Sequence, residues 1–196
     1  MSVTTTFGYS ATEDRLWMRC DGWPQRVWLT RRTARAMVQA LVRLIETTPA
    51  PGDTAGAPSA SERAAAEHDA ALNRPRPGES GQALRMGRAA AADTRELANA
   101  VLCRKFTLIH AGGHADLVFG TSAGEWRLRL TRAGLHRWLR GLQLALAPAQ
   151  WSDWPAVPDW LTRSYLPPAL QKLLDAPLPP ASKRDADHGG DAASPG

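Results

Sequence analysis

The sequence predicts an α+β protein built from two tandem β-β-β-α units. Three observations predict this fold. The stretch RVWLTRRTARAM at 26–37 is echoed by RLRLTRAGLHRW at 127–138. Before each stretch, apolar and polar residues alternate as they do in half-buried strands. After each, apolar residues recur at helical spacing, so each unit has strands followed by one helix.

The two units align without a gap at a constant offset of 101 residues. Residues 5–47 then fall on 106–148, with seven identities in 43 positions, and apolar positions coincide as well. One three-stranded antiparallel sheet with one helix buries little apolar surface. We therefore expect the two units, with antiparallel sheets and one helix each, to share a core about a pseudo-twofold axis. The sequence leaves open whether the units share one sheet or stack two separate ones.

The first unit covers residues 1–47. The stretches TTTFGY, DRLWMRC and RVWLT are expected to be strands, and DGWPQ is a turn between the last two. Thr30 is the expected N-cap, because its side-chain oxygen can accept from an amide of the first helical turn. The helix that follows has one apolar stripe, formed by Ala34, Met37, Val38, Leu41, Leu44 and Ile45.

Residues 48–90 are rich in Ala, Pro, Gly and Ser and have almost no large apolar residue, which predicts a disordered insertion. Within it, SERAAAEHDAAL favours a transient helix. Residues 91–148 are then expected to hold a helix over DTRELANAVLCRK, from Asp93, followed by the second unit. Its strands are KFTLIH, ADLVFG and WRLRLT, its cap is Thr131, and its helical stripe is Leu135, Trp138, Leu139, Leu142, Ala145 and Leu146.

The C-terminal part divides into an arm and a tail. Residues 149–175 place Trp151, Trp154 and Trp160 among prolines, which excludes one long helix and indicates an aromatic arm with two short helices over exposed apolar surface. Residues 176–196 have the composition of a disordered tail.

Composition narrows the class of protein. The formal net charge of +5 comes almost entirely from arginine, since the chain has three lysines, and it is concentrated in the two units. No apolar run is long enough to span a membrane, and the first residues do not resemble a secretory signal. With two cysteines set among apolar neighbours, we expect a reduced, cytoplasmic protein with no membrane contact.

Known catalytic signatures are not found in the sequence. It has no phosphate-binding loop, dinucleotide fingerprint, nucleophile elbow or zinc-protease motif. His110, His114 and Cys103 have the chemistry of zinc ligands, but a strand and turn do not bring them to one face, so solvated turn histidines are favoured. We expect a non-catalytic protein with no metal site and no cofactor.

The strands carry the candidate binding residues. Alternation places Trp17, Arg19, Arg26 and Trp28 on the sheet face opposite the helix, with Arg127 and Arg129 in the second unit. Arginine beside tryptophan suits a single-stranded nucleic acid, since guanidinium groups contact phosphates and indoles stack on bases. The same pattern also suits a protein interface, or side chains that cover one another through cation-π contacts.

Two further arginines, Arg31 and Arg132, follow the predicted caps and occupy first helical turns, where the helix dipole disfavours positive charge. Two explanations are open. Either an anionic partner or an acidic group of the other unit lies near them, or carbonyls at the sheet edge accept their hydrogen bonds.

The expected topology is similar to that of PUR-, Whirly- and PC4-type single-strand binders, without a residue motif that supports membership. Two function hypotheses follow. The first is a non-catalytic adaptor or assembly protein that binds protein partners through the open sheet face and the aromatic arm. The second is a single-stranded nucleic-acid-binding protein. The sequence leaves the oligomeric state open.

Overall fold

One sheet holds the six strands of the described residues, and its strand order follows the chain. The computed structural model describes residues 4–48, 59–73, 97–111, 113–152 and 154–162. Neighbouring strands are antiparallel except β3 and β4, which are parallel. The strands are β1 (Thr5–Ser10), β2 (Arg15–Cys20), β3 (Val27–Leu29), β4 (Val101–Ala111), β5 (His114–Thr121) and β6 (Gly124–Thr131).

The strands of both expected units thus share one sheet, an arrangement that the sequence leaves open, and the parallel pairing of β3 with β4 differs from the antiparallel strands that it predicts. Val27 and Trp28 of β3 pair with Val101 and Leu102 of β4, and the amide of Val101 donates to the carbonyl of Arg26 at 2.9 Å. Two separate sheets would leave the edges of β3 and β4 without these partners, which is costly for backbone polar groups. The α+β class is confirmed, whereas the tandem duplication and its pseudo-twofold axis stay predictions.

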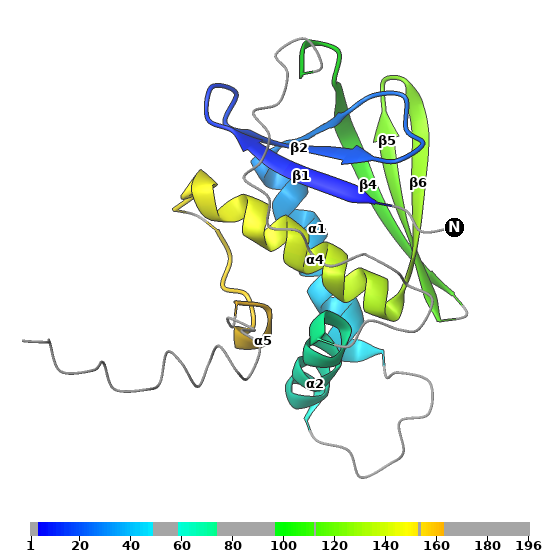
Figure 1. The fold of residues 1–196 in the computed structure, drawn as a ribbon, viewed down its shortest axis with the longest axis vertical. Helices are drawn as coiled ribbons and strands as arrows, with labels where there is room; N and C mark the ends of the chain where they lie inside the picture. Colours follow the sequence, from blue (N-terminus) through cyan, green and yellow to red (C-terminus); the bar gives the residue numbers. More distant parts are fainter. Residues whose placement is uncertain (1–3, 49–58, 74–96, 112, 153, 163–196) are drawn as a thin grey trace, which may run out of the picture. The chain divides into compact units, whose positions relative to one another are not determined.

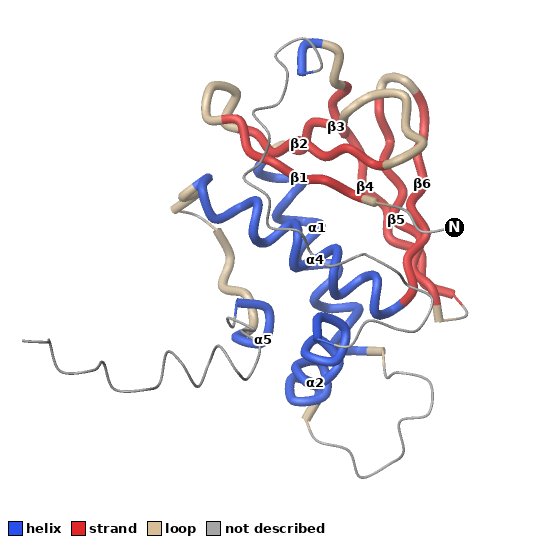
Figure 2. The backbone as a smooth tube through the Cα atoms, viewed as in Figure 1, coloured by secondary structure: helices blue, strands red, loops and turns tan. Residues whose placement is uncertain are grey.

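The helices lie on one side of the sheet in the described part of the chain (Figures 1 and 2). They are α1 (Arg31–Thr47), α2 (Ala60–Asn73), α4 (Arg132–Leu146) and α5 (Asp159–Thr162), with a 3₁₀ turn, η1, at Ala147–Ala149. α1 and α4 pack on the strands, and α2 packs on both of these helices. The opposite side of the sheet, which we call the helix-free face, carries no helix of the described residues.

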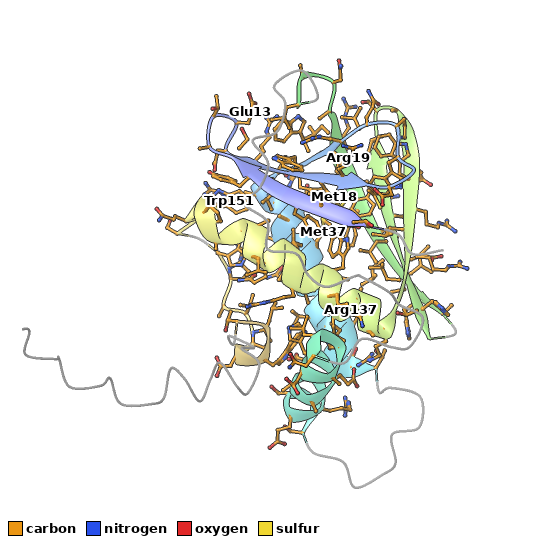
Figure 3. The ribbon with its side chains drawn as sticks, in the orientation of Figure 1. Glu13, Met18, Arg19, Met37, Arg137 and Trp151 are labelled. Atoms are coloured by element: carbon orange, nitrogen blue, oxygen red, sulfur yellow. The ribbon has the colours of Figure 1, made fainter. Side chains whose placement is uncertain are left out.

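The core lies between the sheet and α1 and α4. Alternate strand residues point into it, and Met18 of β2 and Met37 of α1, both fully buried, lie on its two sides (Figure 3). The predicted helical stripes are confirmed, with only Leu44 and Ala145 partly exposed. Alternation along the strands predicts nine core positions, of which Leu130 is only partly buried. The other eight are buried: Leu16, Met18, Cys20, Val27, Leu29, Leu117, Phe119 and Leu128.

The two predicted N-caps are also confirmed. Thr30 Oγ1 accepts from the amide of Thr33 at 3.2 Å, and Thr131 Oγ1 accepts from the amide of Gly134 at 3.1 Å. Both caps have extended backbone angles, as residues just before a helix do. The joint between strand and helix is thus built in the same way at both places.

Two segments differ from the sequence prediction. Val101–Lys105, expected to continue a helix from Asp93, belongs to β4, because pairing with the free edge of β3 overrides the local helical pattern. Within the expected insertion, the helix that the sequence favours over SERAAAEHDAAL is present as α2, but it is packed and not transient, since it buries Ala64, His68 and Ala71. Small alanine side chains let this helix pack closely without large apolar residues. Residues 49–58 and 74–96 lie outside the described part.

The described portion of the aromatic arm, up to residue 162, includes one of the two short helices that were expected, α5, whereas η1 ends at Ala149, where the arm begins. Trp151 and Trp160 are buried, and the Trp160 indole N–H donates to Glu46 of α1 at 3.0 Å. The arm therefore covers the protein's own core at these residues. The rest of the arm, 163–175, and the tail, 176–196, lie outside the described residues. Among the residues that the structure describes, no helix is long and apolar enough to cross a membrane.

Candidate functional site

The structure divides the predicted binding residues among three places. The helix-free face carries the two tryptophans of the first half and four arginines, and the two remaining arginines lie at the joints that begin α1 and α4. The residues on the face are Trp17, Arg19, Arg26, Trp28, Arg127 and Arg129, and those at the joints are Arg31 and Arg132. The eight predicted residues therefore do not form one site.

The tryptophans of the helix-free face are not exposed, contrary to the sequence prediction. Trp17 is 5% exposed and Trp28 is 8% exposed. Trp17 lies over Gly8 of β1, where a Cβ atom would overlap the indole, and the Arg26 guanidinium lies 4.5 Å above the same ring. Trp28 pairs across the sheet with Trp17 and Leu102. The side chains therefore cover one another, as the cation-π alternative expected, and neither ring offers an open stacking surface.

Basic side chains remain exposed on this face. The register places Lys105 opposite Gly120, Arg127 opposite Val118 and Arg129 opposite Asp116, all pointing away from the helices. On the strands of this face the basic residues are Arg15, Arg19, Lys105, Arg127 and Arg129, beside Arg26 at the start of β3, and the acidic residues are Asp116 and Glu125. The strands of this face thus carry an excess of positive charge.

An ion-pair cluster lies at the β5–β6 side of the face. Arg129 donates to both carboxylate oxygens of Asp116, at 2.7 Å and 2.9 Å, and Arg127 lies 3.7 Å from the same group. The hydrogen bonds of Arg129, and the positive charges of both arginines, hold the pKa of the Asp116 carboxyl below its usual range. One carboxylate therefore orients two guanidinium groups that remain 57% and 67% exposed.

Arg31 lies at an exposed joint. Its guanidinium binds Asp14 at 3.0 Å and lies 5.1 Å from the centre of the Trp151 ring. Asp14 also accepts from the Trp151 indole and the Tyr9 hydroxyl, and these bonds, together with Arg31, lower the pKa of its carboxyl. An acidic group of the same half of the chain therefore accounts for this first-turn arginine.

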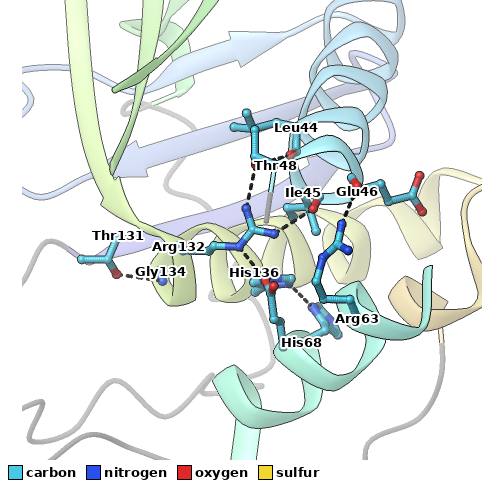
Figure 4. Close-up of polar contacts among 11 residues, drawn as sticks. Leu44, Ile45, Glu46, Thr48, Arg63, His68, Thr131, Arg132, Gly134 and His136 are labelled. Atoms are coloured by element: carbon cyan, nitrogen blue, oxygen red, sulfur yellow. Dashed lines mark hydrogen bonds and ion pairs between the residues drawn. The ribbon is translucent and has the colours of Figure 1, made fainter. Parts of the chain in front are cut away.

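Arg132 lies at a buried joint (Figure 4). Its Nε donates to Glu67 of α2 at 2.5 Å, and its other nitrogens donate to the Thr48 hydroxyl and the Ile45 carbonyl. An acidic side chain and a backbone carbonyl hold this arginine, but neither is the group that was expected, since Glu67 lies in the insertion between the two units and the Ile45 carbonyl belongs to α1 and not to a sheet edge. Arg132 thus connects α4 to α2 and to the end of α1, and it is not available to a partner.

Glu67, His68 and His136 extend this buried network, and the sequence pattern does not predict them. His136 Nε2 lies 3.2 Å from Glu67 Oε2, and the Nδ1 atoms of the two histidines are 3.1 Å apart. With Glu67 as acceptor, His136 donates from Nε2 and accepts at Nδ1, so His68 donates from Nδ1. The one available signal is a histidine among alanines in the expected insertion.

Burial sets the titration of these groups. Burial, with the nearby charges of His136 and Arg140, lowers the pKa of His68 to about 3. Burial also lowers the pKa of His136, although Glu67 opposes the shift. Burial raises the pKa of Glu67, but the hydrogen bonds of His136 and Arg132 outweigh it and the net shift is downward. The network is therefore a carboxylate with two neutral histidines at neutral pH.

Residues considered for metal or thiol chemistry do not assemble into a site. Within the described residues no three His, Cys, Asp or Glu side chains are placed to hold a metal ion. His110 and His114 lie at the ends of the β4–β5 hairpin, where both are exposed. Cys20 and Cys103 are buried, and burial raises the pKa of both thiols, that of Cys103 to about 11. Such thiols are poor nucleophiles at neutral pH.

A cavity of about 390 Å³ opens beside β6, between that strand and the end of β2. Arg127 and Arg129 line one side, and Asp21 and Trp23 of the β2–β3 connection line another. The Trp23 ring packs against Phe119 and Trp126, with ring centres 5.2 Å apart in each pair. The sequence pattern places Trp23 in a turn and does not predict that it reaches the second half of the sheet.

Comparison of the chain with protein-family models, with curated proteins and with solved structures gives no match.

Proposed function

We propose that this is a non-catalytic protein that binds single-stranded nucleic acid on the helix-free face of its sheet. The observation that supports it most is the excess of exposed basic groups on that face, chiefly Arg19, Lys105, Arg127 and Arg129. Guanidinium groups bind phosphates through paired hydrogen bonds. A nucleic-acid backbone offers such groups at regular spacing along a sheet.

The burial of aromatic side chains favours this function over an adaptor that depends on them. A few residues, most often Trp, Tyr and Arg, carry most of the affinity of a protein interface. Trp17, Trp28, Trp151 and Trp160 are all at most 8% exposed, so these anchors are used inside the protein. Contacts to phosphates need only exposed positive charge, and the helix-free face keeps exposed arginines such as Arg127 and Arg129.

The charge-based mechanism predicts a strong dependence on salt. A labelled single-stranded DNA and a labelled RNA, titrated by anisotropy at about 50 mM and about 200 mM salt, should both bind and should weaken steeply at the higher concentration, because bound phosphates release counterions. Absence of binding at the lower salt concentration would exclude the function. A salt-independent affinity would exclude the phosphate mechanism.

A second candidate, the adaptor or assembly protein, is favoured by one apolar side chain on the same face. Ile109 of β4 is 44% exposed, opposite Asp116 in the register and beside the Arg129 ion pair. An exposed isoleucine beside an arginine ion pair can serve as an anchor for a protein partner. If partners are held there, Ile109→Asp should lose them in a pull-down, and unchanged recovery of the same partners would exclude this surface.

The tandem arrangement of two β-β-β-α units is also part of the proposal. Elements of the two halves fall at the same offset of 101 residues, so that β2 matches β5, β3 matches β6 and α1 matches α4. The parallel pairing of β3 and β4 gives corresponding strands of the two halves the same direction. Each half would then contribute arginines to one continuous helix-free face.

A further inference from the structure

The cavity beside β6 combines four kinds of surface. Its lining includes the buried side chains of Cys20 and Leu128, the partly buried ring of Trp23, two arginines, Arg127 and Arg129, and the carboxylate of Asp21, with His114 and Thr131 beside them. A site for a simple inorganic anion has no use for an aromatic ring, apolar side chains or a carboxylate. A nucleotide has use for all of them, because it joins a flat base with polar edges to a phosphate.

We propose that this cavity binds one nucleotide of a single strand, with the base against Trp23 and the adjoining phosphate at Arg127 and Arg129. The proposal rests on the nucleic-acid function proposed above and specifies where a base, and not only the backbone, is bound. A volume of about 390 Å³ is within the range of small-ligand sites, which begin at about 300 Å³.

Trp23 is suited to this role because its neighbours fix the ring. Phe119 contacts it nearly edge-on, at an interplanar angle of 69°, and Trp126 contacts it at 54°. A ring held in this way loses little conformational freedom when a base stacks on it. Trp17 and Trp28, which the sequence favours as stacking residues, are covered, whereas Trp23 lines an open cavity.

The two arginines of the cavity are also held in place by a neighbour, the carboxylate of Asp116. Asp116 binds Arg129 through Nε and Nη2, which leaves the remaining N–H donors of that guanidinium for a phosphate oxygen. Arg127 shares the same carboxylate at 3.7 Å. Across the cavity, the exposed Asp21 can accept from the amino group of a base.

The test compares a labelled single-stranded oligonucleotide with an abasic strand of the same length, which keeps the phosphates and lacks the bases. The full-length wild-type protein should bind the base-containing strand about tenfold more tightly, as one stacked base predicts. Trp23→Leu should remove this preference while still binding both strands. Trp23→Phe should retain most of it, and Trp154→Leu, a partly buried tryptophan outside the cavity, should behave as wild type.

The possible outcomes separate the two proposals. Equal binding of both strands by wild type, or an unchanged preference in Trp23→Leu, overturns the nucleotide site and leaves phosphate binding intact. No binding of either strand at low salt overturns the nucleic-acid function itself.

If Trp23→Leu does not fold, the binding test on this variant is replaced by photocrosslinking of the wild-type protein to a strand that contains 5-iodouracil. A crosslink on the peptide that contains Trp23 supports the site, and crosslinks confined to other peptides overturn it.

Discussion

The two joints between strand and helix share a sequence, Leu-Thr-Arg, and a local structure, but not a role. At the first, Arg31 and its partner Asp14 are 40% and 53% exposed; at the second, Arg132 and Glu67 are 16% and 18% exposed. The difference comes from α2, which packs on α4 and brings Glu67 over the second joint. A repeated motif therefore fixes the cap and the helix start, whereas tertiary packing decides what the arginine does.

The largest expected effect is at the buried joint. Arg132→Met should lower the free energy of unfolding by about 3 kcal/mol, because it leaves the partly buried Glu67 without its cation and removes bonds to Thr48 and Ile45. Chemical denaturation at pH 7 measures it. A loss no larger than that of Arg31→Met would show that the two joints are equivalent.

The pH dependence of stability should also come from the buried network beside the second joint, chiefly from His68. The folded-state pKa of His68, about 3, lies below its unfolded value near 6.5, so the unfolded chain binds the proton first. The stability contributed by neutral His68 is full above pH 6.5 and should fall by about 2 kcal/mol by pH 5.

Denaturation of His68→Leu across this range measures the effect, since that variant should lose this part of the pH dependence. His110→Gln, at an exposed histidine, is the matched control and should behave as wild type. A His68→Leu profile that falls as steeply as wild type would contradict the assignment.

The two caps should be equal in effect. Thr30→Ala and Thr131→Ala each remove one side-chain acceptor for a first-turn amide, so each should cost about 1 kcal/mol. Thermal melts of the two single variants provide the comparison. Unequal costs would show that the surroundings of the joint also affect its local structure.

The smallest effect is expected at the exposed joint. Arg31→Met removes a solvent-exposed ion pair with Asp14, and such pairs contribute little and are screened by salt. The melting temperature should change slightly at low salt and not at all at high salt. A large change that persists in high salt would mean that the contact with Trp151 matters more than the ion pair.

Sequence periodicity predicts much of the fold because it records which face of an element is buried. Leu16, Val27 and Leu117, the apolar stripes, and the caps at Thr30 and Thr131 are all where alternation and helical spacing place them. The pairing of β3 with β4, which makes one sheet of the two halves, was not predictable, since Val101 and Leu102 pair with residues over 70 positions earlier. No local pattern records a pairing between distant edges.

The candidate site was predictable in charge but not in aromatic exposure. Arg19, Arg127 and Arg129 are exposed on the expected face, because alternation decides the direction of a side chain. Trp17 points to that face too, yet the glycine opposite it and the arginine above it bury the ring. Glu67 and His68 were not predicted, since alanine spacing in α2 gives no sign of the helix on which it packs.

The most direct test of the central claim, that the helix-free face binds nucleic acid, is a comparison of two double variants with the same net charge. Arg19→Glu with Arg129→Glu changes the helix-free face, and Arg32→Glu with Arg43→Glu changes exposed positions of α1 on the other side. Anisotropy at low salt should show at least a tenfold loss of single-strand affinity for the first pair and a much smaller loss for the second. Equal losses would mean that only net charge matters and would contradict a binding surface on this face.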